Sequence, residues 1–169
     1  MPLKSTIERA RRDKRQGKSA STQAGEFIRE QIEKIRRGVH GARSTRQAIA
    51  IGLAEARRSG VKLPPPKKGR AKAQTRRKAE YDYAVGQGRR HPKRRPRVSR
   101  AIENVLKHEP HSAASHRALS AQGRRAASRR SAASRSAAAR KAVRTKGAAA
   151  RSAAARKAAR TRARKRRAG

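Results

Sequence analysis

The sequence contains no cysteine and no tryptophan, and only three of its 169 residues are aromatic. Without cysteine the chain forms no disulfide, carries no thiol nucleophile and offers no thiolate ligand for zinc. One phenylalanine and two tyrosines are also too few for the platform of stacked bases that single-strand-binding proteins build. We therefore expect Tyr81 and Tyr83 to form a small packing cluster rather than to stack on bases.

Acidic residues are scarce as well. Ten Asp and Glu stand against fifty Lys and Arg, which gives a net charge of +40 at pH 7. No acidic residue follows Glu109, whereas nineteen Arg and Lys lie from Pro110 onward in a background of alanine and serine. Because arginine stays protonated at any physiological pH, this charge is permanent. The expected partner is a polyanion.

Long apolar runs are also missing. The longest uncharged apolar run, residues 47–54, has eight residues, whereas a membrane-spanning helix needs about 20. Basic segments that bind membrane surfaces usually carry apolar or lipid anchors in addition to their charge. The composition therefore favours nucleic acid over a membrane as the partner, and it predicts a cytoplasmic protein that in a bacterium lies in the nucleoid.

The charge divides the chain into three zones. Residues 1–63 carry sixteen basic and six acidic residues. Residues 64–109 carry fifteen basic and four acidic residues, and residues 110–169 carry nineteen basic residues and no acidic one. Acidic and large apolar residues coincide at the front, which is typical of a small folded module followed by a linker and a polycationic tail. We predict a mainly α fold with a small helical module over 1–63, a proline-containing basic linker with short helices over 64–109, and a low-complexity Ala/Arg/Ser/Lys tail over 110–169.

About three short helices are predicted in the front module. A Ser-x-x-Glu capping box at Ser5–Glu8 opens the first helix, which Gly17 closes. The second runs over 22–37, and the third follows a capping box at Ser44–Gln47 and ends at Arg58. Helical spacing of apolar residues predicts the core: Ala24, Phe27, Ile28, Ile32, Ile35, Ile49, Ile51, Leu53 and Ala56. Val61, just past Gly60, is placed for the hydrophobic contact that often accompanies a glycine C-cap.

The second and third helices of the module invite comparison with a helix-turn-helix. Their connection is longer than the usual three or four residues, and Ile49, Ile51 and Leu53 fit a core better than a groove-facing surface. An ordinary helical hairpin with a basic rim is the favoured interpretation. In the linker, we predict helices over 73–85 and, capped by Ser99, over 100–108.

The tail repeats itself at two scales. Residues 136–151 and 152–167 agree at ten of sixteen positions, and arginine recurs every five residues in parts of the repeat. Five residues advance a side chain by about 140° around a helix, so the charges leave no apolar stripe to bury. Alanine and arginine favour helix, but mutual repulsion opposes it. We predict a tail that is disordered when free and helical in stretches once phosphates neutralise it.

Two resemblances add to this interpretation. In its Ala/Ser/Arg/Lys composition, the tail resembles the carboxyl-terminal arms of linker histones and of bacterial histone-like nucleoid proteins, although fifteen of its nineteen basic residues are arginine. That resemblance implies a nucleoid-associated, histone-like DNA-binding protein. Separately, the motif STRQAIAIGLAEARR at 44–58 resembles the signature of a bacterial domain of unknown function. It covers roughly residues 30–63 and implies no activity and no catalytic residues.

No catalytic site, metal site or cofactor is expected, and we predict that the chain is not an enzyme. Few carboxylates and no cysteine accompany His108, His111 and His116, so these are interpreted as solvated linker histidines. The predicted nucleic-acid contacts are Arg124, Arg125, Arg129, Arg130, Arg135, Arg140, Lys141, Arg144, Lys146, Arg151, Arg156, Lys157, Arg160, Arg162, Arg164, Lys165, Arg166 and Arg167, with Arg43, Arg46, Arg57 and Arg58 as candidate secondary contacts.

Sequence-independent DNA binding and compaction by phosphate neutralisation is the function that these features predict, with double-stranded DNA as the partner. RNA binding or ribosome association is the alternative, because a basic tail does not distinguish one phosphate backbone from another. An interaction with acidic protein tails is a third. Because so small a module gains little from its own core, a homodimer through the N-terminal helices is a further expectation.

Overall fold

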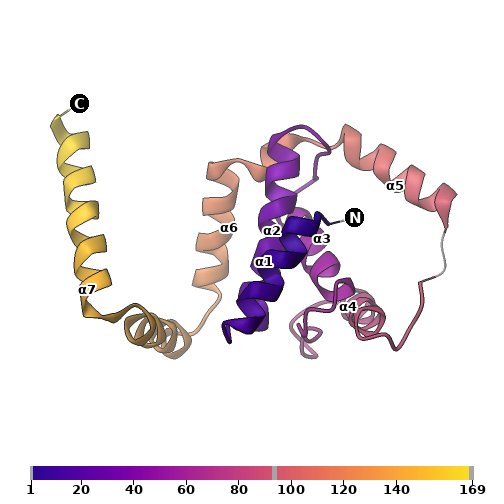
Figure 1. Cartoon of the computed structure of the whole chain (residues 1–169). Coiled ribbons are helices and arrows are strands. Elements are labelled where there is room, and N and C mark those ends of the chain that lie inside the picture. Colours follow the sequence, from indigo (N-terminus) through magenta and orange to yellow (C-terminus); the bar gives the residue numbers. More distant parts are fainter. Residues whose placement is uncertain (1, 93–94, 168–169) are drawn as a thin grey trace. The chain divides into compact units, whose positions relative to one another are not determined.

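The computed structural model describes residues 2–92 and 95–167, and this part of the chain contains helices and no β-strand (Figure 1). The elements are α1 (Lys4–Arg15), α2 (Ala20–Arg36), α3 (Thr45–Arg58), α4 (Ala73–Gly86), α5 (Pro96–His108), the 3-10 helix η1 (His111–Ala114), α6 (His116–Ser128) and α7 (Ala132–Arg167). The predicted mainly α class is confirmed. The three helices predicted for residues 1–63 are only part of the helical content, and the prediction of a tail that is disordered when free is wrong, because helices continue through the linker and the tail.

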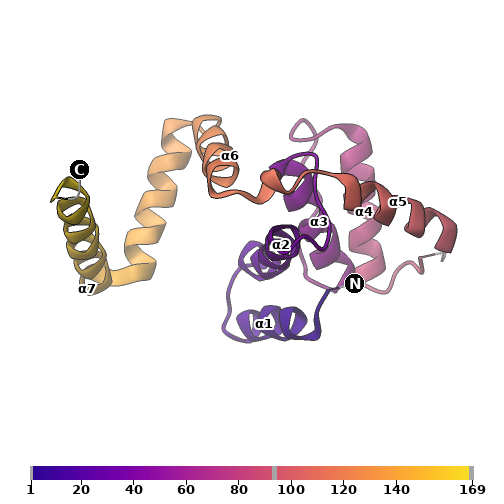
Figure 2. The same cartoon turned by 90° about the horizontal axis from the view of Figure 1, so that it is seen from above.

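The chain divides into two compact units, residues 1–122 and residues 123–169. The first unit contains α1 to α5, η1 and most of α6, and the second contains the end of α6 and all of α7. This division does not follow the three zones of composition, because the first unit extends past residues 63 and 109 alike. Within the first unit, α2 packs between α1 and α3, and α4 packs on α3 (Figure 2).

The three helices of the front module lie within two residues of their predicted positions. The capping box before α3 forms with one change: the amide of Gln47 donates to Ser44 Oγ at 3.2 Å, but Gln47 Oε1 accepts at 2.8 Å from the amide of Arg43, one residue before the N-cap. Gly38 follows α2 in a left-handed conformation with φ of 74°, which L side chains rarely adopt. Local signals therefore determine where α3 begins and where α2 ends.

The first helix starts differently from its prediction. The capping box at Ser5–Glu8 does not form, because α1 begins at Lys4 and already includes Ser5. Instead, the Leu3 amide donates to the two carboxylate oxygens of Glu30 on α2, at 3.1 and 3.2 Å. The ammonium of Lys34 lies 2.5 Å from Glu30 Oε1. A side chain from another helix thus satisfies an amide that the local sequence leaves unpaired.

Glu30 is only 2% exposed, and its surroundings hold it in the charged form. Burial pushes the pKa of the Glu30 carboxyl upward, but hydrogen bonds from Lys34, Thr6 and Leu3, together with the positive charge of Lys34, lower that pKa on balance. A carboxyl whose pKa is lowered by folding stabilises the fold above its ordinary pKa of about 4.3, and this contribution is lost as the pH falls through the lowered value.

We expect Glu30→Gln to reduce the free energy of unfolding by about 2 kcal/mol at pH 7, since it removes charge-assisted hydrogen bonds inside the α1–α2 joint. Below pH 4 the difference from the unmodified chain should shrink, because Glu30 is then losing its own charge. Urea denaturation at several pH values measures both effects. Glu33→Gln is the matched control, since Glu33 lies exposed on the same helix. An equal loss in the two variants would contradict the role given to Glu30.

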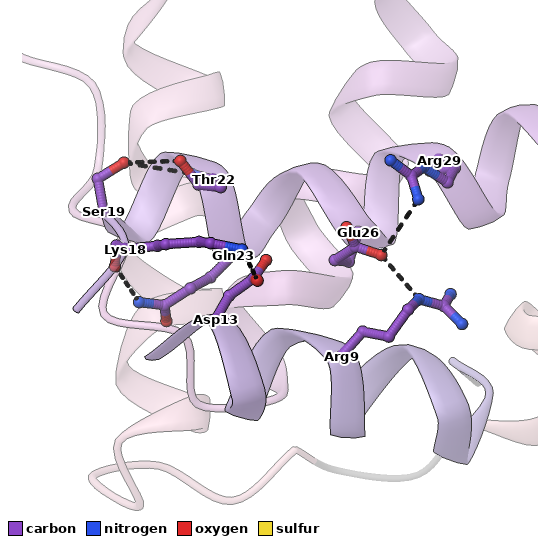
Figure 3. A network of polar contacts seen from close by, with 8 residues as sticks. All are labelled: Arg9, Asp13, Lys18, Ser19, Thr22, Gln23, Glu26 and Arg29. Atoms are coloured by element: carbon purple, nitrogen blue, oxygen red, sulfur yellow. Dashed lines mark hydrogen bonds and ion pairs between the residues drawn. The ribbon is translucent and has the colours of Figure 1, made fainter. Parts of the chain in front are cut away.

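A second polar set joins α1 to α2 nearer the surface (Figure 3). Arg9 Nε lies 2.7 Å from Glu26 Oε2, and Arg29 Nη1 lies 3.7 Å from the same oxygen. Beyond the end of α1, Lys18 Nζ lies 2.6 Å from Asp13 Oδ1. Ion pairs with a partly exposed member contribute up to about 1 kcal/mol each to stability. These contacts therefore fix the orientation of α1 on α2 and add little to the free energy of unfolding.

The apolar core of the first unit consists of two clusters. One contains Ile32, Ile35, Ala42, Ala48, Ala113 and Ala114, and the other contains Ala10, Ala24, Phe27, Ala56 and Val61. Phe27 and Ile35 are fully buried, as the spacing on the second helix predicted. The predicted core residues Ile49, Ile51 and Leu53 are only half-buried. The core therefore relies on α2 for its large side chains and on alanine for much of the rest.

The buried face of α3 is made of small residues, with Ala48, Gly52 and Ala56 at helical spacing. A Cβ atom added at Gly52 would lie 2.7 Å from the Cα of Ile28 on α2. Such a distance is possible only for glycine, so the two backbones approach each other closely here. Of the larger side chains predicted for the core of α3, the half-buried Leu53 packs against the second cluster, whereas Ile49 and Ile51 belong to neither cluster.

The segment predicted to lead from the linker into the tail belongs to the core of the first unit. Ala113 and Ala114 of η1 are buried against α2 and α3. The Thr45 hydroxyl donates to the Ala113 carbonyl at 2.7 Å, and Arg36 Nε donates to the Ala114 carbonyl at 2.9 Å. The backbone amide of Gly41 donates to the Leu106 carbonyl at 2.7 Å. Alanine thus has a packing role at this position.

Helix α4 matches its prediction to within one residue, whereas α5 begins earlier than expected. Pro96 occupies the first turn of α5, where its missing N–H costs nothing, and Ser99 lies inside the helix and not at its cap. No residue of α5 is buried. Val98, Ile102 and Val105 are 50, 55 and 61% exposed and share one side of the helix by their spacing.

The tail is helical in the structure, which corrects the prediction that it is disordered when free. Helix α7 covers Ala132–Arg167 and contains one non-helical residue, Gly147, at φ 67° and ψ 171°. A spacing of five residues keeps some successive arginines, such as Arg135 and Arg140, out of the i,i+3 and i,i+4 positions where like charges repel, although Arg140 and Arg144 do occupy i,i+4. In the structure, the helix propensity of alanine and arginine prevails over this repulsion.

Candidate nucleic-acid interface

Helix α7 presents its charge on two straight segments joined at Gly147, where the chain turns (Figure 1). The segment after Gly147 has nine basic residues in residues 148–167 and no acidic one. At 1.5 Å per residue this segment is about 30 Å long. The arrangement produces a rod of positive charge without a compensating carboxylate.

The charges of this segment point in more than one direction. Each residue advances about 100° around the helix axis, so Arg151 and Arg162 project to one side. Arg156 and Arg160 project to roughly the opposite side by the same rule. A duplex that contacts one side leaves the other available for a second polyanion.

The predicted tail contacts are exposed wherever the structure describes their side chains. Arg124 and Arg125 lie on α6, Arg129 and Arg130 lie in the turn before α7, and the others lie on α7. The side chains of Lys146 and Lys165 are outside the described residues. Several guanidinium groups also donate to backbone carbonyls nearby, as Arg135 does to the Arg130 carbonyl at 2.7 Å. Such hydrogen bonds leave the positive charge itself uncompensated.

The four secondary contacts predicted in the front module have different environments. Arg43 and Arg46 are exposed at the start of α3. Arg57, in contrast, is only 8% exposed, and its guanidinium donates to the Leu63 carbonyl at 3.3 Å. Burial lowers the pKa of Arg57, and the charge of Asp82 partly offsets this. Arg57 therefore supports the loop after α3, and we leave it out of the candidate interface.

The environment of Arg58 is intermediate between that of the exposed Arg43 and Arg46 and that of the buried Arg57. Its Nη1 is 3.4 Å from Asp82 Oδ1 on α4, and its side chain is about half exposed. Burial raises the pKa of Asp82, while the charges of Arg58, Arg57 and Lys78 act in the opposite direction. Arg58 consequently helps to hold α4 on α3 and is a weaker candidate for binding phosphate than Arg43 or Arg46.

Tyr81 does not form the packing cluster that was predicted for it. Its side chain on α4 is 38% exposed, whereas Tyr83 is half-buried. The guanidinium carbon of Arg90 lies 5.6 Å from the centre of the Tyr81 ring, within the range of a cation–π contact. The sequence offers no signal for this pairing, because Arg90 follows a turn nine positions later.

The described residues were also compared with the requirements of a metal site and of a membrane-spanning helix. In residues 2–92 and 95–167, no group of three or more His, Cys, Asp and Glu side chains is placed to hold a metal ion. His108 Nδ1 lies 2.7 Å from the Asn104 carbonyl oxygen on its own helix. The described helices also include none that is long and apolar enough to cross a membrane.

The comparison with known families concerns the front of the chain. Residues 4–68 match the model of a family of unknown function (DUF6496). This span contains α1, α2 and α3 and ends in the loop before α4, so the predicted presence of a domain of unknown function in this part is supported. No curated protein and no solved structure gives a significant match. None of these comparisons supports the resemblance of the tail to histone-like proteins.

Proposed function

We propose that this protein binds double-stranded DNA through α7 and the end of α6 without reading base sequence, and that it compacts DNA as a nucleoid-associated protein. The observation that carries the proposal is the exposed set of basic side chains on a helix without any carboxylate. Each phosphate that such a side chain neutralises releases condensed counterions. This release supplies affinity that is independent of sequence.

The charge density of α7 suits a duplex. Residues 148–167 carry nine basic residues over about 30 Å of helix. The same length of B-DNA carries roughly 18 phosphate charges. One segment thus neutralises up to half of the phosphates beside it, and several molecules side by side would neutralise most of them.

Compaction follows from the distribution of charge around α7. Because Arg156 and Arg160 project away from the side that bears Arg151 and Arg162, one helix has basic groups for two duplexes. The exposed Arg43 and Arg46 of the first unit supply further contacts. A homodimer through the N-terminal helices would add a second way to bridge duplexes, and it stays a prediction.

Competition binding tests the proposal. We expect unrelated duplexes of equal length to compete within about threefold of one another, because the contacts are to phosphate. Affinity should fall steeply between 50 and 200 mM salt, by about 10³–10⁵-fold for six to ten phosphate contacts. Gel shifts with several competitors over a salt series measure both quantities. A salt-insensitive complex or a strong preference for one duplex sequence would refute sequence-independent phosphate binding.

The alternative polyanion is RNA, since α7 offers nothing that distinguishes the two backbones. Cross-linking in cells, followed by separate digestion with DNase and RNase, identifies the nucleic acid that the protein binds. Recovery of DNA supports the proposal. Recovery of ribosomal RNA alone would replace it with ribosome association, and complexes that survive both nucleases would indicate an acidic protein partner.

A further inference from the structure

A second candidate binding surface, outside α7, surrounds Tyr81. An open surface cavity of about 740 Å³ is lined there by Tyr81, Arg90, His91 and Arg95. Phe27 is fully buried and Tyr83 is half-buried. Tyr81 is therefore the most exposed aromatic ring of the chain.

The end of α4 explains how basic residues reach this ring. Gly88 has φ of 72°, a left-handed conformation that turns the chain back on itself after α4. The Gly88 amide donates to the Val85 carbonyl at 3.0 Å, and the Arg89 amide donates to the Ala84 carbonyl at 2.9 Å. These two bonds fix the reversal, and Arg90 thereby comes to lie over the Tyr81 ring.

The cavity is basic as well as aromatic. Arg90, His91 and Arg95 are all exposed, and no ion pair joins them to a carboxylate among the residues that the structure describes. The two acidic residues on either side of Tyr81 have other partners: Asp82 pairs with Arg58, and Glu80 pairs with Arg76 at 3.8 Å. Uncompensated cations beside an exposed aromatic ring are the features with which proteins bind single strands.

We propose that this cavity binds an unpaired nucleotide, with the base stacked on Tyr81 and the adjoining phosphates held by Arg90 and Arg95. The inference rests on the proposed function, because the strand that supplies the nucleotide is the DNA that α7 binds. It adds a preference that α7 lacks: a strand with accessible bases gains stacking, whereas a duplex whose bases are already stacked does not. The site thus directs the protein toward melted or single-stranded stretches.

The composition of the chain allows a direct measurement. With no tryptophan and two tyrosines, the full-length Tyr83→Phe variant has Tyr81 as its sole strong fluorophore. Three ligands of equal length are titrated at 100 mM salt: a thymidine oligonucleotide, an abasic oligonucleotide of the same charge, and a duplex. We expect the thymidine strand to quench the Tyr81 emission at least twofold. The abasic strand and the duplex should leave most of the emission, because neither offers a free base.

Variants at Tyr81 test whether stacking contributes to affinity. In the full-length chain, Tyr81→Leu should weaken binding of the thymidine strand about tenfold, which is within the range for loss of one stacked base. Its affinity for duplex DNA should be unchanged, and its thermal unfolding followed by circular dichroism should match that of the unmodified chain, which shows that the variant is folded. Tyr81→Phe keeps an aromatic ring and should bind the thymidine strand as well as the unmodified chain does.

The outcomes separate this inference from the proposed function. Equal quenching by the thymidine and abasic strands, or an unchanged affinity of Tyr81→Leu for thymidine, overturns the nucleotide site while duplex binding stands. Failure of the full chain to bind any of the three ligands overturns both proposals. A Tyr81→Phe variant as weak as Tyr81→Leu would also reject stacking, since it would assign the effect to the phenol hydroxyl.

Discussion

Removal of residues 123–169 should weaken duplex binding by about two orders of magnitude or more at 50 mM salt, and it should flatten the salt dependence. The deletion takes away eighteen of the fifty basic residues and no acidic one, which lowers the net charge from +40 to +22. If about half of these eighteen contact phosphate, the slope of log K against log salt should become shallower by about 8. Fluorescence anisotropy over a salt series measures both changes.

The truncated chain should keep its fold. The cut follows the boundary between the two compact units and leaves Leu119 packed on the first apolar cluster. Circular dichroism of the 1–122 fragment should therefore show cooperative unfolding. A full-length variant with lysine for every arginine in 151–167 is the control, and it should keep the original salt slope. If the fragment bound DNA as tightly as the full chain with an unchanged slope, the first unit would be the principal interface.

The helices of the first unit were predictable because their signals are local. Ser44 and Gln47 cap α3 through contacts between residues three or four apart, and glycine ends α2 through its own conformation. The start of α1 was mispredicted because its partner, Glu30, is 27 positions away from Leu3. A capping box in the sequence does not reveal that a distant carboxylate satisfies the amide instead.

The extent of the folded unit could not be read from composition. Ala113 and Ala114 lie in a segment rich in alanine and serine, which is the composition of the tail, yet they are buried against α2 and α3. Alanine gives little hydrophobic signal because it has little surface to bury. It fits here because Gly52 and the small residues of α3 bring the helices close together.

The candidate interface was predicted in part. The tail cations are exposed wherever their side chains are described, as their number and the lack of apolar neighbours indicated. Arg57 and Tyr81 differ because exposure depends on tertiary packing: Arg57 turns back to the Leu63 carbonyl, and Arg90 reaches Tyr81 only after the turn at Gly88. The helical state of the tail was missed because the mutual repulsion of the cations was taken to outweigh the helix propensity of alanine and arginine.

A large effect of a point substitution on stability is expected at Gly52. A Cβ atom there would lie 2.7 Å from the Cα and 2.9 Å from the amide nitrogen of Ile28. Both are backbone atoms, so no side-chain rotation relieves the overlap, and α2 and α3 must move apart. Overpacking of this kind costs about 1–3 kcal/mol, and occasionally more, whereas alanine in place of glycine favours a helix by about 1 kcal/mol.

We therefore expect Gly52→Ala to lower the free energy of unfolding by about 2 kcal/mol, the upper part of the packing cost less the helix gain. A core of this size supplies only about 3–5 kcal/mol, so the loss is a large fraction of the total. Gly25→Ala on α2 is the matched control, since no atom lies within 4 Å of the added Cβ, and it should stabilise by about 0.5–1 kcal/mol. Denaturation of the 1–122 fragment compares the two variants without the helical signal of α7. If Gly52→Ala were as stable as Gly25→Ala, the close contact between α2 and α3 would not exist in solution, and the alanine-rich core that depends on it would need another explanation.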